Sequence, residues 1–141
     1  MFAFIKAFFA GLIAMLGFNQ GLLWLLDRAA LANTTSWSSQ SLFGTGIPVV
    51  AWLALWGALW GLVIWSLVRR AEAAGYYVGA IILGAVLLTG VAVAVTPWLG
   101  SAVFGVSLVG YAMNAIGVML AANAAYGLGF AALMRLFHPP R

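Results

Sequence analysis

The chain has 141 residues, of which 66% are hydrophobic and only 6% are charged. Soluble domains are about 45–50% apolar and about 25% charged, so a soluble fold of this composition would expose large apolar patches to water. The formal net charge is +4, but the basic residues are scattered and form no basic stripe, which argues against nucleic-acid binding. Cysteine is absent, which excludes disulfides, thiolate metal sites, iron–sulfur clusters and cysteine nucleophiles.

Long apolar runs occupy most of the chain. A helix needs about 20 apolar residues to cross the hydrocarbon core of a bilayer, and runs of this length or longer lie at 7–26, 48–68, 78–99 and 106–134. We therefore predict an all-α integral membrane protein, with residues 1–141 forming a single domain, a bundle of four transmembrane helices. The last run is longer than a span requires, so we expect it to tilt, to break near its glycines or to project beyond the membrane.

The charges between the runs predict an orientation. Only Arg28 falls on one side of the membrane, beside Asp27. The other five basic residues fall on the opposite side: Lys6, Arg69, Arg70, Arg135 and Arg141. Since short cytoplasmic loops carry an excess of Lys and Arg, we expect both termini to be cytoplasmic.

Aromatic residues gather near the ends of the predicted helices. Trp24, Trp37, Trp52 and Trp98 lie at the predicted outer boundary, and Trp65, Tyr76 and Tyr77 lie at the inner one. Amphipathic rings favour these depths. We interpret both groups as aromatic belts.

Small residues mark the faces through which the helices are expected to pack. Inside lipid, helices associate where small side chains let their backbones approach closely. Such residues recur at four-residue spacing in the first, second and fourth runs: Gly17 and Gly21; Gly57 and Gly61; and Gly117, Ala121, Ala125 and Gly129. The third run is richer in Ile, Leu and Val, so we expect it to face more lipid.

A tryptophan stripe lies on the second predicted helix. Trp52, Trp56 and Trp60 recur every four residues, roughly 100–140° around the helix from the glycine pair. The stripe is either a face for lipid or a partner protein, or a set of rings that fills gaps within the bundle.

Ionisable side chains are absent from the middle of the predicted spans. Asp27 and Glu72 lie at helix borders, and His138 lies in the C-terminal tail. Since buried ionisable groups are the usual mark of transport or proton relay, the sequence argues against proton-coupled exchange. It also argues against catalysis by paired carboxylates or metal, and no serine has a plausible base. We expect no enzymatic activity, no cofactor and no metal site.

Neutral polar side chains remain as candidates for a ligand or pore site: Asn19, Gln20, Thr89, Asn114 and Asn123. An amide in hydrocarbon needs a hydrogen-bond partner. One interpretation is that these residues join helices structurally. The sharper hypothesis is a polar site of Asn19, Gln20 and Asn114 that holds a headgroup, a quinone or a small ion.

Two short segments of the chain are similar in sequence, which raises the question of an internal duplication. Leu42-Phe43-Gly44 precedes the second run, and Val103-Phe104-Gly105 precedes the fourth. Duplicated two-helix halves would form parallel repeats, as in some transporters. Three residues are too few to establish this.

The first half of the chain resembles a group of small proteobacterial inner-membrane proteins with four helices. The resemblance rests on Gly17-Phe18-Asn19-Gln20-Gly21, Gly46-Ile47-Pro48 and Trp56-Gly57-Ala58-Leu59-Trp60-Gly61. It implies a bacterial inner membrane and carries no activity. Members of the group often have His at the position of Asn19, so a histidine role there is not available to this chain.

These features favour a small accessory, assembly or scaffold subunit that packs against other membrane proteins. The expected partners are membrane lipid and either other membrane-protein subunits or further copies of the chain. The alternative hypothesis is a small homo-oligomeric channel or uncoupled transporter for a small solute or ion, with the amides lining its path.

Overall fold

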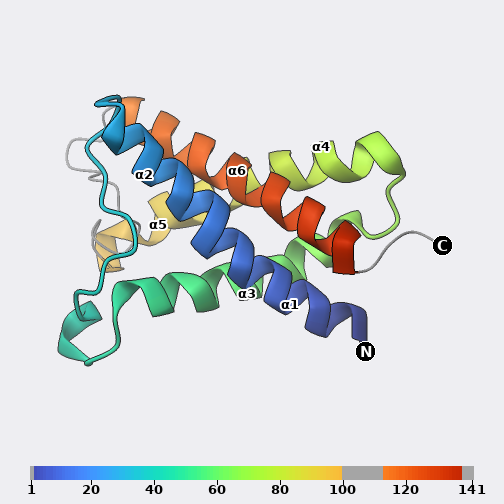
Figure 1. The fold of residues 1–141 in the computed structure, drawn as a ribbon, viewed down its shortest axis with the longest axis horizontal. Coiled ribbons are helices and arrows are strands. Elements are labelled where there is room, and N and C mark those ends of the chain that lie inside the picture. The colour runs from blue at the N-terminus through green and yellow to red at the C-terminus, as the bar shows by residue number, and fades with distance from the viewer. Residues whose placement is uncertain (1, 100–112, 138–141) are drawn as a thin grey trace.

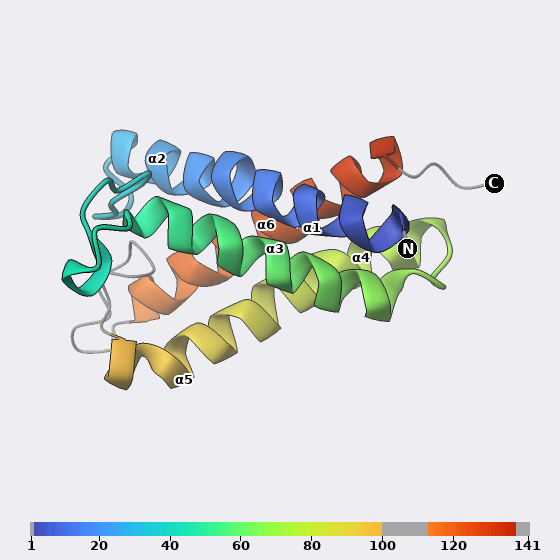
Figure 2. The same ribbon diagram turned by 90° about the horizontal axis from the view of Figure 1, so that it is seen from below.

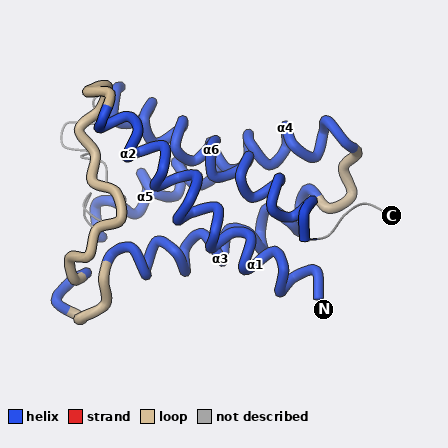
Figure 3. Tube along the Cα trace, in the orientation of Figure 1, coloured by secondary structure: helices blue, strands red, loops and turns tan. Residues whose placement is uncertain are grey.

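The computed structural model describes residues 2–99 and 113–137, with the side chains of 2–95 and 115–137. Helices long and apolar enough to cross a membrane occupy Phe2–Arg28, Val49–Val68, Ala73–Val95 and Ala115–Phe137. Figure 3 shows helices joined by loops throughout the described chain. The predicted all-α fold with four transmembrane helices is confirmed.

Two of these four helices contain a π-helical turn. Helix 1 consists of α1 (Phe2–Ala14), the π-helix η1 (Met15–Asn19) and α2 (Gln20–Arg28). Helix 3 consists of α4 (Ala73–Leu83), the π-helix η3 (Gly84–Leu88) and α5 (Thr89–Leu99). Helix 2 is α3 (Val49–Val68), helix 4 is α6 (Met113–Phe137), and the 3₁₀ turn η2 (Leu42–Gly44) lies in the loop before α3.

Several helices extend beyond the predicted apolar runs. Helix 1 begins at Phe2 rather than residue 7, and helix 3 begins at Ala73 rather than 78. Lys6 is tolerated inside helix 1 because its Nζ donates a hydrogen bond to the Phe137 carbonyl. Helix 4 ends at Phe137, three residues beyond the prediction, while its predicted start at 106 lies outside the described residues.

The helices form two hairpins that run in the same direction. In Figures 1 and 2, α1 with α2 and α4 with α5 run from one end of the bundle to the other, and α3 and α6 return. The described chain therefore begins and ends at the same end of the bundle, as the Lys6–Phe137 bond also shows. Which side of the membrane this end faces remains a prediction.

Glycines allow the backbones of the first hairpin to touch. A Cβ added at Gly57 would lie 2.8 Å from the Gly11 carbonyl oxygen, and one added at Gly61 would lie 2.5 Å from the Ala7 carbonyl oxygen. Real Cβ contacts are essentially never this short. The predicted pair Gly57 and Gly61 thus lies at the crossing of α1 and α3, with Gly11 opposite.

The second hairpin crosses in an equivalent way. A Cβ added at Gly84 would lie 2.6 Å from the Asn123 carbonyl oxygen and 3.0 Å from the Gly127 Cα, and one added at Gly127 would collide with the Ala80 carbonyl. Each π-helix begins four residues after the crossing residue of its own helix, Gly11 or Ala80.

The returning helices share a sequence pattern around their crossing glycines. In each, an aromatic residue is followed by a small one, and the pair recurs four positions later: Trp56-Gly57-Ala58-Leu59-Trp60-Gly61 and Tyr126-Gly127-Leu128-Gly129-Phe130-Ala131. Both halves of the chain are therefore π-containing hairpins that cross at small residues and run in parallel. The sequence similarity between the two halves lies at these crossing glycines rather than in the short segments 42–44 and 103–105. Leu42–Gly44 forms the 3₁₀ turn before α3, while the segment 103–105 lies outside the described residues.

Three predicted packing glycines make no contact within the bundle. Within the part of the chain that the structure describes, Gly17, Gly21 and Gly117 have no heavy atom within 4 Å of an added Cβ. The contact expected from Gly17 and Gly21 is made instead by Gly11, which meets Gly57 and Gly61 on α3. Gly129, in contrast, packs under the ring of Phe18.

Aromatic side chains fill the core at the end of the bundle where the chain begins. Trp65 is 9% exposed and Tyr76 is 3% exposed, and their rings meet edge to face with centroids 6.5 Å apart. The guanidinium of Arg135 lies over the Tyr76 ring, 4.6 Å from its centroid. The interpretation of these two rings as an interfacial belt is wrong, because interhelical packing buries them.

Helix 3 is the least buried of the four spans, with 28% of its apolar window buried. The other spans reach 33% or 44%. Ile, Leu and Val give helix 3 few positions at which another backbone can approach closely. It therefore exposes more apolar surface than the other helices, as its composition predicted.

Candidate functional site

Buried polar side chains meet in the middle of the bundle. Among the described residues these are Asn19, Gln20, Thr89 and Asn123, with exposed fractions of 5%, 1%, 4% and 7%. They come from helices 1, 3 and 4. We call these four residues the amide network.

Hydrogen bonds join the amide network into one chain. Asn123 Nδ2 donates to Thr89 Oγ1 at 2.9 Å, and Asn19 Nδ2 donates to Asn123 Oδ1 at 2.9 Å. Gln20 Nε2 then donates to Asn19 Oδ1 at 3.0 Å. No buried side-chain nitrogen or oxygen of the described residues lacks a partner.

The two π-helices end where the network begins. Asn19 is the last residue of η1 and Gln20 the first of α2, while Thr89 is the first residue of α5 after η3. A π-turn carries one extra residue and is found frequently at functional sites. The extra residue in each helix brings these side chains inward on the same level of the bundle.

The network continues into the loop that precedes α3. The backbone N–H of Trp37 donates to Gln20 Oε1 at 3.0 Å, and its indole Nε1 donates to the Leu16 carbonyl at 2.8 Å. Thr34 Oγ1 donates to the Leu23 carbonyl at 2.8 Å. This loop is thus fastened along the C-terminal half of helix 1.

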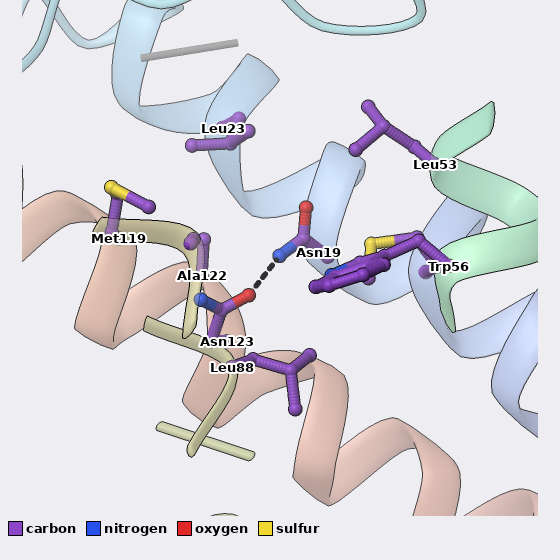
Figure 4. Close-up of a pocket in the computed structure, with 10 residues that line it drawn as sticks. Asn19, Leu23, Leu53, Trp56, Leu88, Met119, Ala122 and Asn123 are labelled. Atoms are coloured by element: carbon purple, nitrogen blue, oxygen red, sulfur yellow. Dashed lines mark hydrogen bonds between the residues drawn. The ribbon is translucent and has the colours of Figure 1, made fainter. Parts of the chain in front are cut away.

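A cavity of about 20 Å³ lies beside Asn19 and Asn123. Figure 4 shows both amides at its edge, joined by their hydrogen bond. Apolar side chains form most of its wall: Met15, Leu23, Leu53, Trp56, Leu88, Ala92, Met119 and Ala122. A space of this size holds about one water molecule, so it is far smaller than the roughly 300–1,000 Å³ typical of ligand pockets.

The predicted site is partly assembled. Asn19 and Gln20 meet Asn123 and Thr89, whereas the side chain of Asn114 lies outside the described residues. Because each amide satisfies another, the geometry favours the structural interpretation over a headgroup or ion site. Among the described residues, no group of three or more His, Cys, Asp or Glu side chains is placed to hold a metal ion.

The tryptophan stripe divides between the surface and the interior. Trp52 is 37% exposed. Trp56 lines the internal cavity, and Trp60 is half-buried against the main core and meets the Trp56 ring edge to face, with centroids 5.9 Å apart. The structure therefore supports the gap-filling interpretation for Trp56 and Trp60, and leaves Trp52 as the exposed member.

An apolar groove of about 430 Å³ lies on the outer surface of helices 1 and 4. It is lined by Gly17, Phe18, Gly21, Leu22, Trp24, Leu25 and Ala125. Gly17 and Gly21 form an open floor, since nothing lies within 4 Å of a Cβ at either position. Gly117 and Ala121, predicted on the same stripe as Ala125, are exposed on helix 4.

Sequence reasoning missed Tyr126, which carries a further polar group into the bundle. Its hydroxyl is fully buried and donates to the Gly57 carbonyl at 2.6 Å, joining helix 4 to helix 2. A tyrosine in an apolar run is usually assigned to the interface, so only the relation between Trp56 and Tyr126 in the two hairpins would have pointed to the core.

Comparison with known proteins adds no family to this description: no family model matches the chain, and no curated protein or solved structure is significantly similar to it.

Proposed function

We propose that this protein is an accessory or scaffold subunit of the membrane that receives a helix of another membrane protein in the groove of helices 1 and 4. The observation that carries the proposal is the open floor at Gly17 and Gly21, where no heavy atom of the described residues lies within 4 Å of an added Cβ. Membrane helices associate most closely where glycines face each other across the contact. The two tight crossings inside this bundle use the same device.

The interior supports a structural role rather than a chemical one. Its polar groups bond to one another, and the cavity beside them has about the volume of one water molecule. A subunit that acts through its surface needs no larger internal space. We accordingly propose no enzymatic activity and no cofactor.

The charge distribution supports the proposed setting. Lys6 and Arg135 lie toward the end where the described chain begins and ends, and Arg28 lies at the end of helix 1 on the opposite side. We place the protein in a bacterial inner membrane with the termini in the cytoplasm, by the excess of basic residues on that side.

Substitution of Gly21 by Leu, with Gly90 as the matched control, tests the proposal. Both glycines have open space around an added Cβ, but Gly21 lines the groove and Gly90 lies in α5 away from it. After gentle extraction from the source membrane, native mass spectrometry should show the wild-type chain bound to a different, larger membrane protein. Gly21→Leu should weaken the affinity for the partner about fivefold or more, since overpacking a close contact costs about 1–3 kcal/mol, while Gly90→Leu should leave it unchanged.

Two results would contradict the proposal. Retention of the partner by Gly21→Leu would show that the groove is not the contact. A homo-oligomer as the only assembly would favour the channel hypothesis, and flux measurements in liposomes would then follow.

A further inference from the structure

Trp37 holds an unfavourable backbone conformation in the loop before α3. Its φ is +48°, in the left-handed region that bulky residues seldom adopt. Such a conformation persists where surrounding contacts over-determine it, and it is often found at switch regions. Here the contacts are the two hydrogen bonds that Trp37 donates to helix 1.

One of these bonds replaces a bond of the α-helix. In an α-helix the Gln20 N–H would donate to the Leu16 carbonyl, four residues earlier. It donates instead to the Met15 carbonyl, five residues earlier as in a π-turn, and to the Gly17 carbonyl, three residues earlier. The Leu16 carbonyl, which this N–H passes over, accepts the indole N–H of Trp37 at 2.8 Å.

The second bond connects the loop to the amide network. The Trp37 backbone N–H donates to Gln20 Oε1, and the other end of the Gln20 amide donates to Asn19. From Asn19 the chain of bonds continues to Asn123 and Thr89. The position of an exposed loop residue is thus joined through side chains to helices 3 and 4.

We propose that Trp37 is a latch that keeps helix 1 in its π-helical form and thereby couples the outer loop to the amide network. When the indole leaves, the Leu16 carbonyl loses this donor and regains a partner if the Gln20 N–H returns to it. That exchange removes the extra residue from the turn and rotates α2 by about 100° relative to α1. The rotation carries Gln20 out of the network and Gly21 away from the groove.

The latch requires no partner protein, so it stands or fails independently of the proposed function. A partner or ligand that moves the loop would switch the helix, and the groove would change shape as a result. Coupling of this kind is reciprocal, so an occupant of the groove would also alter the loop.

Hydrogen exchange measured by NMR on the intact chain in lipid nanodiscs tests the latch. Trp24 is the internal reference, because the residue is 41% exposed against 44% for Trp37 and its indole donates no hydrogen bond within the described residues. We expect the Trp37 indole N–H to exchange at least tenfold more slowly than that of Trp24. Equal rates would overturn the proposal, and this measurement needs no variant.

Trp37→Phe then tests the coupling, with Trp52→Phe as control. Phenylalanine keeps the aromatic ring and lacks the N–H donor, so helix 1 should return to the α form. The backbone amide resonances of Gln20 and Gly21 and the side-chain NH₂ resonances of Asn123 should therefore shift. Trp52 is 37% exposed and its side chain makes no hydrogen bond within the described residues, so its substitution should change none of these signals. If Trp37→Phe changes only the amides of the loop, the coupling is refuted.

Discussion

Two glycines in helix 3 should respond in opposite directions to the same substitution. A Cβ at Gly84 would lie 2.6 Å from the Asn123 carbonyl oxygen, about 0.8 Å short of the 3.4 Å at which ordinary contact begins, and the opposing atom is backbone that cannot swing aside. Helices 3 and 4 must therefore separate, and overpacking of this kind costs about 1–3 kcal/mol. A Cβ at Gly90 meets no described atom within 4 Å, so Gly90→Ala should gain up to about 1 kcal/mol of helix propensity.

Gly84→Ala also receives that propensity gain, so its net loss of unfolding free energy should be about 0–2 kcal/mol. The gain cancels in the comparison, so the two variants should differ by the overpacking cost, about 1–3 kcal/mol. Equilibrium unfolding in mixed micelles, followed by circular dichroism, measures both. If the variants are equally stable, or if Gly90→Ala is the weaker one, then the crossing of helices 3 and 4 does not depend on backbone contact at Gly84.

Two further predictions follow from the hydrogen bonds of the bundle, and a third follows from the distribution of basic residues. Tyr126→Phe removes the hydroxyl bonded to Gly57 and should lower the free energy of unfolding by about 0.6–1.7 kcal/mol in the same micelle assay, with helix content unchanged. Asn123→Leu breaks the bonds to Asn19 and Thr89 and should cost about 1–3 kcal/mol; a smaller loss than for Tyr126→Phe would contradict the central place of Asn123. Reporter fusions at the N-terminus and the C-terminus should both be active on the cytoplasmic side, and one fusion active outside would overturn the predicted orientation.

The composition was sufficient to predict the fold class, because a bilayer imposes a fixed length on every apolar helix. The glycine pair of helix 2 was likewise found from spacing alone, since α3 is a regular α-helix from Val49 to Val68 and spacing maps directly onto its faces. Gly57 and Gly61 lie at the crossing for that reason. Where the helix is regular, periodicity identifies the contact face.

The faces of helix 1 were mispredicted because of η1. One extra residue in the turn Met15–Asn19 rotates everything after it by about 100° relative to a regular helix. The true crossing residue, Gly11, precedes the π-turn, while Gly17 lies within it and Gly21 beyond it. No residue type marks a π-turn in an apolar run, so local sequence did not indicate this rotation.

Spacing on a regular helix also does not show which polar residues meet. Asn19 and Gln20 are predicted to share a polar site with Asn114 of helix 4. Their partner on that helix is Asn123 instead, which lies about 180° from Asn114 on a helical wheel. Thr89 and Asn123 were recognised singly, and only the packing of helix 4 against both π-helices shows that they belong to one network.

Comparison of the two hairpins shows that this backbone arrangement does not require the amide network. Asn19 follows the crossing residue Gly11 by the same number of positions that Leu88 follows Ala80, and Asn123 precedes Gly127 as Leu53 precedes Gly57. All four equivalent side chains line the same cavity: Asn19, Leu88, Asn123 and Leu53. The pair Leu53 and Leu88 is therefore apolar and the pair Asn19 and Asn123 is polar, although both hairpins make the same kind of backbone contact.

This comparison makes a prediction about the double variant Asn19→Leu/Asn123→Leu. Each single substitution leaves one buried amide without its partner, which costs more than removal of both. The double variant should therefore be more stable than the sum of the single losses predicts, with a coupling energy of about 0.6–1.7 kcal/mol in the double-mutant cycle. Strict additivity would show that Asn19 and Asn123 do not act as a pair. If the double variant folds well but loses partner binding or the Trp37 latch, the amides are retained for those roles rather than for stability.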